Sequence, residues 1–308
     1  MHLSKHVSDS FRSRPPFNIL DHATNSYRME QRTQKTKFLV LACLSVAVIA
    51  GLTLAIYHGS ANAQNKIAIE HTGIKDIITN TNKTNIVLVH GAWADGSSWG
   101  KVITILKNAG YHVIAVQLPL HSLADDVATV KRAIDLVGKP VTLVGHSYGG
   151  AVITNAAYNN PNVTGLVYIA AFAPDEGQSL STFVSPAKFP KELFITDSGG
   201  FLYLNPKLFR EFFAQDVNSS EADIMAIAQK PFNQSNFVAK SGPPAWKQLP
   251  TWYQISSADR MIPPYIERAF AKQMNATTLT INASHVSYVS HPNEIAQFIL
   301  NATKEIRK

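Results

Sequence analysis

The feature that most constrains the fold is an alternation that begins near residue 85: an apolar, β-branched run, a turn, then an amphipathic stretch. Four such runs are predicted to be buried strands: Asn85 to His90, His112 to Leu118, Val141 to Gly145 and Val163 to Ala170. Their hydrophobicity is continuous rather than alternating, which is typical of a parallel sheet covered on both faces. Two further strands are predicted near the end of the chain, over Trp252 to Ser256 and Thr278 to Asn282.

Helical patterns occupy the intervals between these strands. They cover Ser98 to Asn108, Leu123 to Val137 and Ala151 to Asn159, and a last helix is predicted over Pro292 to Ile306. Strand and helix alternation of this kind predicts the α/β class, with a doubly wound, mostly parallel sheet and helices on both of its faces.

One interval, residues 176–250, breaks this alternation. Its patterns are helical over Pro206 to Asp216 and Ser220 to Lys230, with Pro and Gly between them and no convincing strand. An inserted helical cap is therefore predicted there, within a single domain that covers residues 64–308.

The first 63 residues have the composition of an export signal. An apolar stretch from Phe38 to Tyr57 follows a basic arm and precedes Ala61-Asn62-Ala63. These are the three parts of a secretory signal peptide, with cleavage expected after Ala63. A signal anchor is the alternative, because about 20 apolar residues also span a bilayer. Both interpretations keep the basic arm cytoplasmic and place the rest outside, either periplasmic or secreted, or anchored through residues 38–57.

Cleavage after Ala63 gives a direct prediction: the mature exported protein begins at Gln64. N-terminal sequencing of the protein from the exported fraction checks this prediction. An intact leader in that fraction would show that the apolar stretch is an anchor.

Charge and cysteine content exclude several classes of function. Seven basic and three acidic residues precede Ala63, so the leader carries +4 of the net charge of +7 and the remaining chain is only mildly basic. No basic run with interleaved aromatic residues follows, which argues against nucleic-acid binding. The single cysteine, Cys43, lies in the leader, so the globular part has neither a disulfide nor a thiol nucleophile.

The sequence Gly145-His146-Ser147-Tyr148-Gly149 fits the G-x-S-x-G pattern and lies between a predicted strand and a predicted helix. In that context the glycines permit a strained turn that exposes the serine Oγ, so Ser147 is predicted to be a nucleophile. A second oxyanion donor comes from the loop after an earlier strand, which here reads His90-Gly91-Ala92-Trp93. The backbone N–H groups of Ala92 and Tyr148 are therefore the predicted oxyanion hole, and His90 is interpreted as a buried residue that fastens the loop.

The acid and the base are expected after the nucleophile, at the carboxyl ends of later strands. Asp259 follows the strand Trp252 to Ser256, and His285 follows the strand Thr278 to Asn282. Asp175 and His291 are their rivals. Asp259 and His285 are preferred because both directly follow predicted strands, whereas His291 precedes Pro292 at the start of the last helix.

Four segments together resemble the α/β-hydrolase superfamily, and within it the branch of plant methylesterases, salicylate-binding esterases, hydroxynitrile lyases and related bacterial hydrolases. They are Val87 to Trp99, Leu143 to Gly150, Ser256 to Pro263 and Ser284 to Pro292. The resemblance covers the chain from about Asn85 onward, and it places the family's nucleophile, acid and base on Ser147, Asp259 and His285. The family's opening antiparallel hairpin has no convincing counterpart before Asn85.

The resemblance implies a serine hydrolase, most simply a carboxylesterase for a small ester, lactone or methyl ester, that needs no metal and no cofactor. A lyase and a catalytically idle ligand receptor on the same fold are the alternatives. The related hydroxynitrile lyases carry a threonine where this chain has Gly91 and a lysine where it has Val286. Trp93 and Trp246 are expected at the substrate pocket, together with other aromatic residues of the cap, Phe201 and Tyr203.

Overall fold

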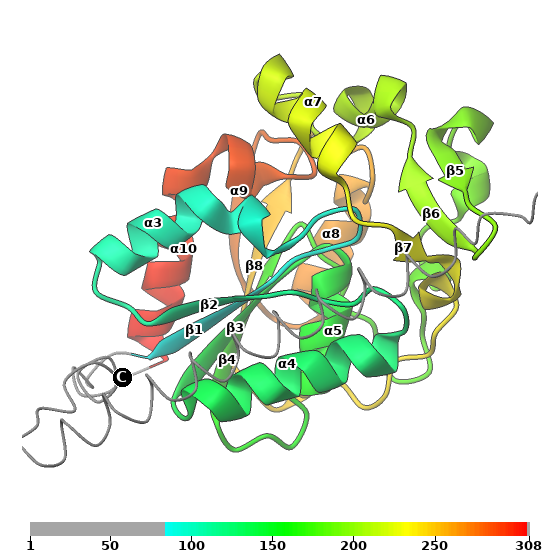
Figure 1. Cartoon of the computed structure of the whole chain (residues 1–308). Helices are drawn as coiled ribbons and strands as arrows, with labels where there is room; N and C mark the ends of the chain where they lie inside the picture. The colour runs from blue at the N-terminus through cyan, green and yellow to red at the C-terminus, as the bar shows by residue number, and fades with distance from the viewer. Residues whose placement is uncertain (1–83, 307–308) are drawn as a thin grey trace, which may run out of the picture. The chain divides into compact units, whose positions relative to one another are not determined.

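The computed structural model describes residues 84–306, so the predictions for the leader and for residues 64–83 lie outside the described part. A six-stranded sheet, with the strand order β2-β1-β3-β4-β8-β9, forms the centre of this part (Figure 1). All five pairings in it are parallel. The strands are β1 (Asn85–Val89), β2 (Val113–Val116), β3 (Val141–His146), β4 (Val163–Ile169), β8 (Thr251–Ser256) and β9 (Thr277–Ile281).

The burial of the strands follows their place in the sheet. Every residue of β3 and β8 is buried, as expected for central parallel strands that are covered on both faces. The two edge strands differ, since β2 is mostly half-buried and β9 is largely exposed. The prediction of a buried strand at residues 112–118 therefore needs correction: a strand is present, but its edge position leaves one side without a neighbouring strand.

Helices cover both faces of the sheet, as predicted. They are α3 (Gly100–Asn108), α4 (Leu123–Val137), α5 (Tyr148–Ala156), α8 (Pro264–Gln273), α9 (Ser287–Ser290) and α10 (Pro292–Glu305). Right-handed crossovers place α3 on one face, because the chain moves from β1 outward to β2, and α4 and α5 on the other, because it then moves back through β3 to β4. The last helix, α10, packs beside α3 (Figure 1).

The reversal of direction between β1 and β3 defines where a site can form. Loops that leave the carboxyl ends of two neighbouring strands toward opposite faces leave a crevice between them, and ligands of open α/β sheets bind there. The residues that follow β1 are His90 and Gly91, and the residue that follows β3 is Ser147. The topology thus brings the predicted oxyanion loop and the predicted nucleophile to one point.

The inserted segment between β4 and β8 is only partly helical. Its helices, α6 (Pro206–Phe213) and α7 (Ser219–Ala228), lie where they were predicted. The prediction that the segment has no strand is wrong, because β5 (Phe194–Thr196), β6 (Phe201–Leu204) and β7 (Phe232–Asn233) form a small antiparallel sheet. Each of these strands has only two to four residues, too short for a hydrophobic period to be visible in the sequence.

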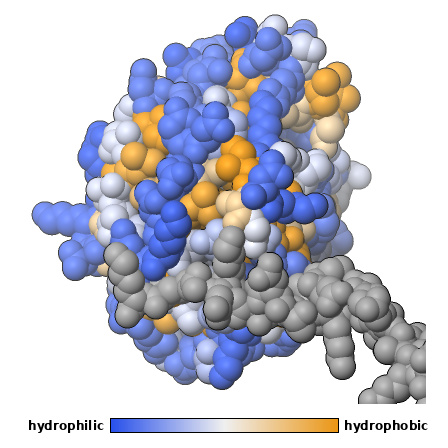
Figure 2. All heavy atoms as spheres, turned by 90° about the vertical axis from the view of Figure 1, so that its left-hand side faces the viewer, coloured by the Kyte–Doolittle hydropathy of each residue, from blue (hydrophilic) through white to orange (hydrophobic). Residues whose placement is uncertain are grey.

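The face of the described part that Figure 2 shows is mostly hydrophilic. On the face turned toward the viewer in Figure 2, hydrophobic residues appear as separate patches between polar ones. Such a distribution is ordinary for a globular domain, because there is not enough polar surface to cover it completely. Within residues 84–306, no helix has both the length and the apolar character needed to cross a membrane.

Candidate active site

Ser147 sits on a sharp turn between β3 and α5. Its backbone angles, φ 52° and ψ −123°, are unfavourable for a residue with a Cβ atom. The chain passes close to itself on both sides of this turn. A Cβ atom at Gly145 would lie 2.6 Å from the carbonyl oxygen of Gly149, and one at Gly149 would lie 2.6 Å from that of Val89. Glycine is therefore required at both positions to project the Ser147 hydroxyl above the sheet.

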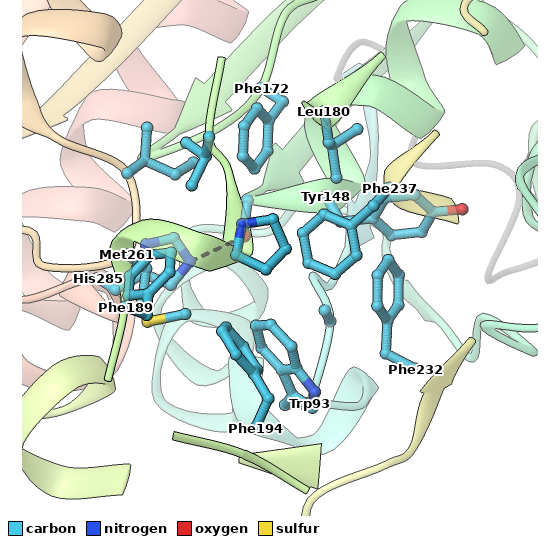
Figure 3. Close-up of a pocket in the computed structure, with 15 residues that line it drawn as sticks. Trp93, Tyr148, Phe172, Leu180, Phe189, Phe194, Phe232, Phe237, Met261 and His285 are labelled. Atoms are coloured by element: carbon cyan, nitrogen blue, oxygen red, sulfur yellow. Dashed lines mark hydrogen bonds between the residues drawn. The ribbon is translucent and has the colours of Figure 1, made fainter. Parts of the chain in front are cut away.

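A continuous line of hydrogen bonds joins the three predicted side chains. The His285 ring contacts the Ser147 Oγ atom through Nε2 at 2.8 Å (dashed line in Figure 3). It contacts the Asp259 Oδ2 atom through Nδ1 at 2.6 Å. All three residues are buried. Because a carboxylate can only accept, Nδ1 carries the ring proton, and Nε2 is left free to accept the proton of the serine hydroxyl.

The backbone around this line holds the acid and the histidine in place. The other carboxylate oxygen of Asp259 accepts N–H bonds from Met261 and Ile262, at 2.6 and 2.9 Å. His146 donates from Nε2 to the carbonyl oxygen of His285 at 2.9 Å, and burial holds the pKa of His146 well below its usual value. His146 is therefore a neutral support for His285, a role that the sequence pattern did not indicate.

The proposed oxyanion hole lies beside Ser147. Ala92 lies in the loop after β1, and Tyr148 is the first residue of α5. Their N–H groups therefore belong to the two segments that meet at the crevice between β1 and β3. Among residues 84–306, neither N–H donates to another protein group. Two free backbone donors beside a nucleophile can bind a developing oxyanion.

His90 fastens the oxyanion loop, as predicted. One ring nitrogen contacts the carbonyl oxygen of Gly91 at 2.8 Å, and the other accepts the N–H of Leu118 at 3.0 Å. Burial lowers the pKa of His90 to about 4, so the ring is neutral near pH 7. With both nitrogens bound to backbone groups, His90 has no nitrogen free to act as a base.

The two rival residues lie elsewhere. Asp175 pairs with Lys247 at 2.5 Å, and both side chains are partly exposed. His291 precedes α10, as predicted, and its Nδ1 contacts the Ser290 hydroxyl at 2.9 Å. Neither residue contacts Ser147 among the described interactions. No group of three or more His, Cys, Asp or Glu side chains within residues 84–306 is placed to hold a metal ion.

A pocket with a cavity volume of about 30 Å³ opens onto Ser147 and His285 (Figure 3). Around the two catalytic candidates the lining is almost entirely apolar, and about half of it comes from the inserted segment. The other lining residues are Ala92, Trp93, Tyr148, Phe172, Leu180, Val184, Pro186, Phe189, Phe194, Phe232, Phe237, Met261 and Ile262.

Of the aromatic residues expected at the pocket, Trp93 lines it and Trp246 does not. The Trp93 ring lies 5.8 Å from that of Phe194, and its indole N–H donates to the Leu202 carbonyl oxygen at 3.0 Å. Trp246 instead donates to Pro174 at 3.2 Å, and Phe201 and Tyr203 are also outside the lining. The phenylalanines of the cap that line the pocket, Phe189, Phe194, Phe232 and Phe237, were not predicted. The sequence does not show which way the side chains of a short cap strand face.

The fold and this site define a class: an α/β protein with a Ser-His-Asp constellation at the carboxyl edge of its parallel sheet. The sequence profile of the alpha/beta hydrolase family matches residues 86–298. The chain belongs to this family.

Most of the relatives found carry the names of hydrolases or esterases. The alpha/beta hydrolase nvfD of Aspergillus novofumigatus is 26% identical over 247 residues, covering 72% of this chain and 98% of its own. The pyrethroid hydrolase of Sphingobium wenxiniae is 27% identical over 245 residues, covering 70% of this chain and 86% of its own. The fold is shared with an extracellular alpha/beta-hydrolase of a Paenibacillus species at a TM-score of 0.64, with 22% identity and coverage of 72% and 99%.

Proposed function

We propose that this chain is a serine hydrolase that cleaves small, uncharged, apolar carboxylic esters through an acyl-enzyme. One observation carries the proposal: the line of hydrogen bonds from Asp259 through His285 to Ser147 ends at the floor of an apolar pocket. A catalytically idle receptor would need only the pocket. An ordered nucleophile, base and acid beside two free N–H groups supports turnover instead.

In the proposed reaction, the Ser147 Oγ atom attacks the ester carbonyl carbon while His285 Nε2 removes the hydroxyl proton. The imidazolium then gives this proton to the leaving alcohol oxygen, and the acyl group remains on Ser147. Water repeats the attack with His285 as base and releases the acid. Asp259 holds the Nδ1–H tautomer and stabilises the charged ring in both halves of the reaction.

The N–H groups of Ala92 and Tyr148 bind the oxyanion that forms in both steps. Donors of this kind contribute about 3 kcal/mol each when judged by mutation, because they are fixed before charge develops. Their fixed position follows from the glycines and from the two hydrogen bonds of His90.

The pocket supports an uncharged apolar substrate. Apart from His285, no lining side chain is an acid or a base of the ordinary pH range, and no Lys or Arg is present to pair with an anionic substrate. Burying an unpaired charge in such surroundings is costly, whereas an aliphatic or aromatic group gains from burial. The names of relatives, among them a carbendazim hydrolyzing esterase of a Nocardioides species and the pyrethroid hydrolase, agree with a hydrolase that acts on ester bonds in general.

Two positions argue against the lyase alternative. A Cβ atom at Gly91 would lie 2.7 Å from the Ser147 Cβ atom, so a threonine, as in the related lyases, does not fit this backbone. Val286, where those enzymes carry a lysine, is fully buried and apolar, so it offers no charge to a departing cyanide.

The proposed reaction predicts hydrolysis of a short p-nitrophenyl ester that depends on Ser147, with no cleavage of mandelonitrile above background. Release of p-nitrophenol and of cyanide by the same purified protein, from Gln64 onward, measures both activities. The Ser147→Ala variant is the matched control for the ester assay. Rapid cyanide release without ester turnover would overturn the assignment in favour of a lyase.

We also propose that this reaction takes place outside the cytoplasm. The support is the basic arm, the apolar stretch of residues 38–57 and the Ala61-Asn62-Ala63 sequence that precede the catalytic domain. Periplasmic or secreted enzyme is expected if the leader is cleaved, and a membrane-anchored enzyme is expected if it is not.

A further inference from the structure

A second carboxyl group lies buried behind the catalytic acid, and the proposed mechanism does not use it. Glu267 belongs to the first turn of α8, and its side chain is completely buried. Its Oε2 atom accepts the N–H of Ser256, the last residue of β8, at 2.8 Å. No donor among the described residues reaches its Oε1 atom. An ionised carboxylate with a single N–H partner and no cation would be costly here.

Glu267 and Asp259 are held at the same turn after β8. Ser256 donates its N–H to Glu267 at 2.8 Å, and its carbonyl oxygen accepts the N–H of Asp259 at 3.2 Å. The two acid side chains interact there. Two carboxylates cannot hydrogen-bond unless one of them carries a proton. The Asp259 carboxylate already accepts two backbone N–H groups and the His285 N–H. Glu267 has only the Ser256 N–H, so the shared proton belongs on its Oε1 atom.

The surroundings of Glu267 agree with this placement of the proton. Burial raises the pKa of Glu267 well above its usual value, and the charge of Asp259 raises it further. Tyr253 faces the pair from β8, and burial raises its pKa too, so its hydroxyl stays neutral. Arg268, the next residue of α8, is exposed and makes the smallest of these contributions to the pKa of Glu267, which it lowers.

We propose that Glu267 remains a neutral carboxylic acid and acts as a positioning residue, donating its O–H to the Asp259 carboxylate, a role that rests on the hydrolase mechanism proposed above. The bond fixes the Asp259 carboxylate so that Oδ2 faces His285 Nδ1. It also withdraws part of the negative charge that Asp259 presents to His285. The line of hydrogen bonds that ends at Ser147 thereby gains one residue and runs from Glu267 through Asp259 and His285 to Ser147.

The test compares Glu267→Gln, which keeps a donor for Asp259 and an acceptor for Ser256, with Glu267→Leu, which keeps neither. Glu294→Gln, at an exposed position of α10, is the matched control. Two measurements need no turnover. Infrared spectra report the C=O stretch of a protonated carboxyl group, and proton NMR reports the His285 Nδ1–H signal. Steady-state kinetics with the p-nitrophenyl ester give kcat, KM and the pH profile.

We expect the protonated-carboxyl band near neutral pH in the wild type and in Glu294→Gln, and its loss in Glu267→Gln. Glu267→Gln should keep kcat within about threefold of the wild-type value. Glu267→Leu should lower kcat by roughly 10- to 100-fold with little change in KM, which is the range seen when the hydrogen-bond partners that orient metal-ligating side chains are replaced. Without the donor, Asp259 attracts the imidazolium more strongly. The apparent pKa of the acidic limb of the pH–rate profile should therefore rise in Glu267→Leu, and the His285 Nδ1–H signal should shift.

Absence of the carboxyl band in the wild type would overturn the neutral form of Glu267. Equal loss of kcat in Glu267→Gln and Glu267→Leu, or an unshifted Nδ1–H signal and pH profile in Glu267→Leu, would overturn the positioning role. Failure of the hydrolase proposal looks different: the wild type would show the band and the Nδ1–H signal but no Ser147-dependent ester turnover. In that case the NMR comparison of the Gln and Leu variants still decides the positioning role.

Discussion

Replacing Ser147 with alanine is expected to lower kcat for ester hydrolysis by about 10⁴- to 10⁶-fold. The variant keeps the pocket and both oxyanion N–H groups but has no Oγ atom, so no acyl-enzyme can form. His285→Ala should cost a similar factor, because the Ser147 hydroxyl then has no base within 2.8 Å. Turnover of a p-nitrophenyl ester, measured with enough enzyme to detect the residual rate, gives both factors.

The double variant of Ser147 and His285 tests whether the two residues act as one unit. Residues of a catalytic triad are far from additive, so the double variant should be about as slow as either single variant. Far-UV circular dichroism and thermal unfolding should match the wild type, because alanine at either position leaves the sheet and helices unchanged. A Ser147→Ala enzyme that kept more than a tenth of the wild-type rate would rule out the covalent mechanism.

Asp259→Asn is expected to lower kcat by about 10⁴-fold, the cost of the wrong histidine tautomer. The asparagine oxygen can still accept the N–H groups of Met261 and Ile262, which turns its NH₂ group toward His285. The ring must then accept at Nδ1 and carry its proton on Nε2, where it can no longer take the proton of Ser147. Steady-state kinetics measure the loss, and it should fall mainly on kcat.

Asp175→Asn is the control for this assignment. The Asp175 carboxylate pairs with Lys247 at a partly exposed position, and exposed ion pairs contribute about 1 kcal/mol or less. Turnover should therefore stay within about twofold of the wild type, since so small a local change does not reach the site. If Asp175→Asn were crippling and Asp259→Asn harmless, the acid would have been assigned to the wrong strand.

The sheet and its helices were largely predictable because their signals are local. The continuous apolar runs of β1, β3 and β4 could be recognised within five to seven residues. The α4 helix has the bounds that were predicted, since Ser122 caps its first turn and Gly138 ends it. The start of α5 was placed three residues too late, because the helix begins directly after the strained residue Ser147.

The cap was predicted less well, because its structure depends on contacts over long distances in the chain. The strand β7 has two residues and exists only because it pairs with β6, some 30 residues earlier. The positions of Trp93 and Trp246 relative to the pocket also depend on contacts between distant parts of the chain. Both side chains are aromatic and buried, and only the packing of the cap decides that the first lines the pocket and the second does not.

The sequence by itself determined the α/β alternation and the glycine-flanked turn at Ser147, because each is a property of a short segment. Only the tertiary structure decided which acid and which histidine meet Ser147, since His285 lies 138 residues away from it in the chain. It alone also decided that Glu267, eight residues after Asp259, accepts the N–H of Ser256 at the turn that holds Asp259. Such contacts arise from how strands and helices pack, and no local pattern records them.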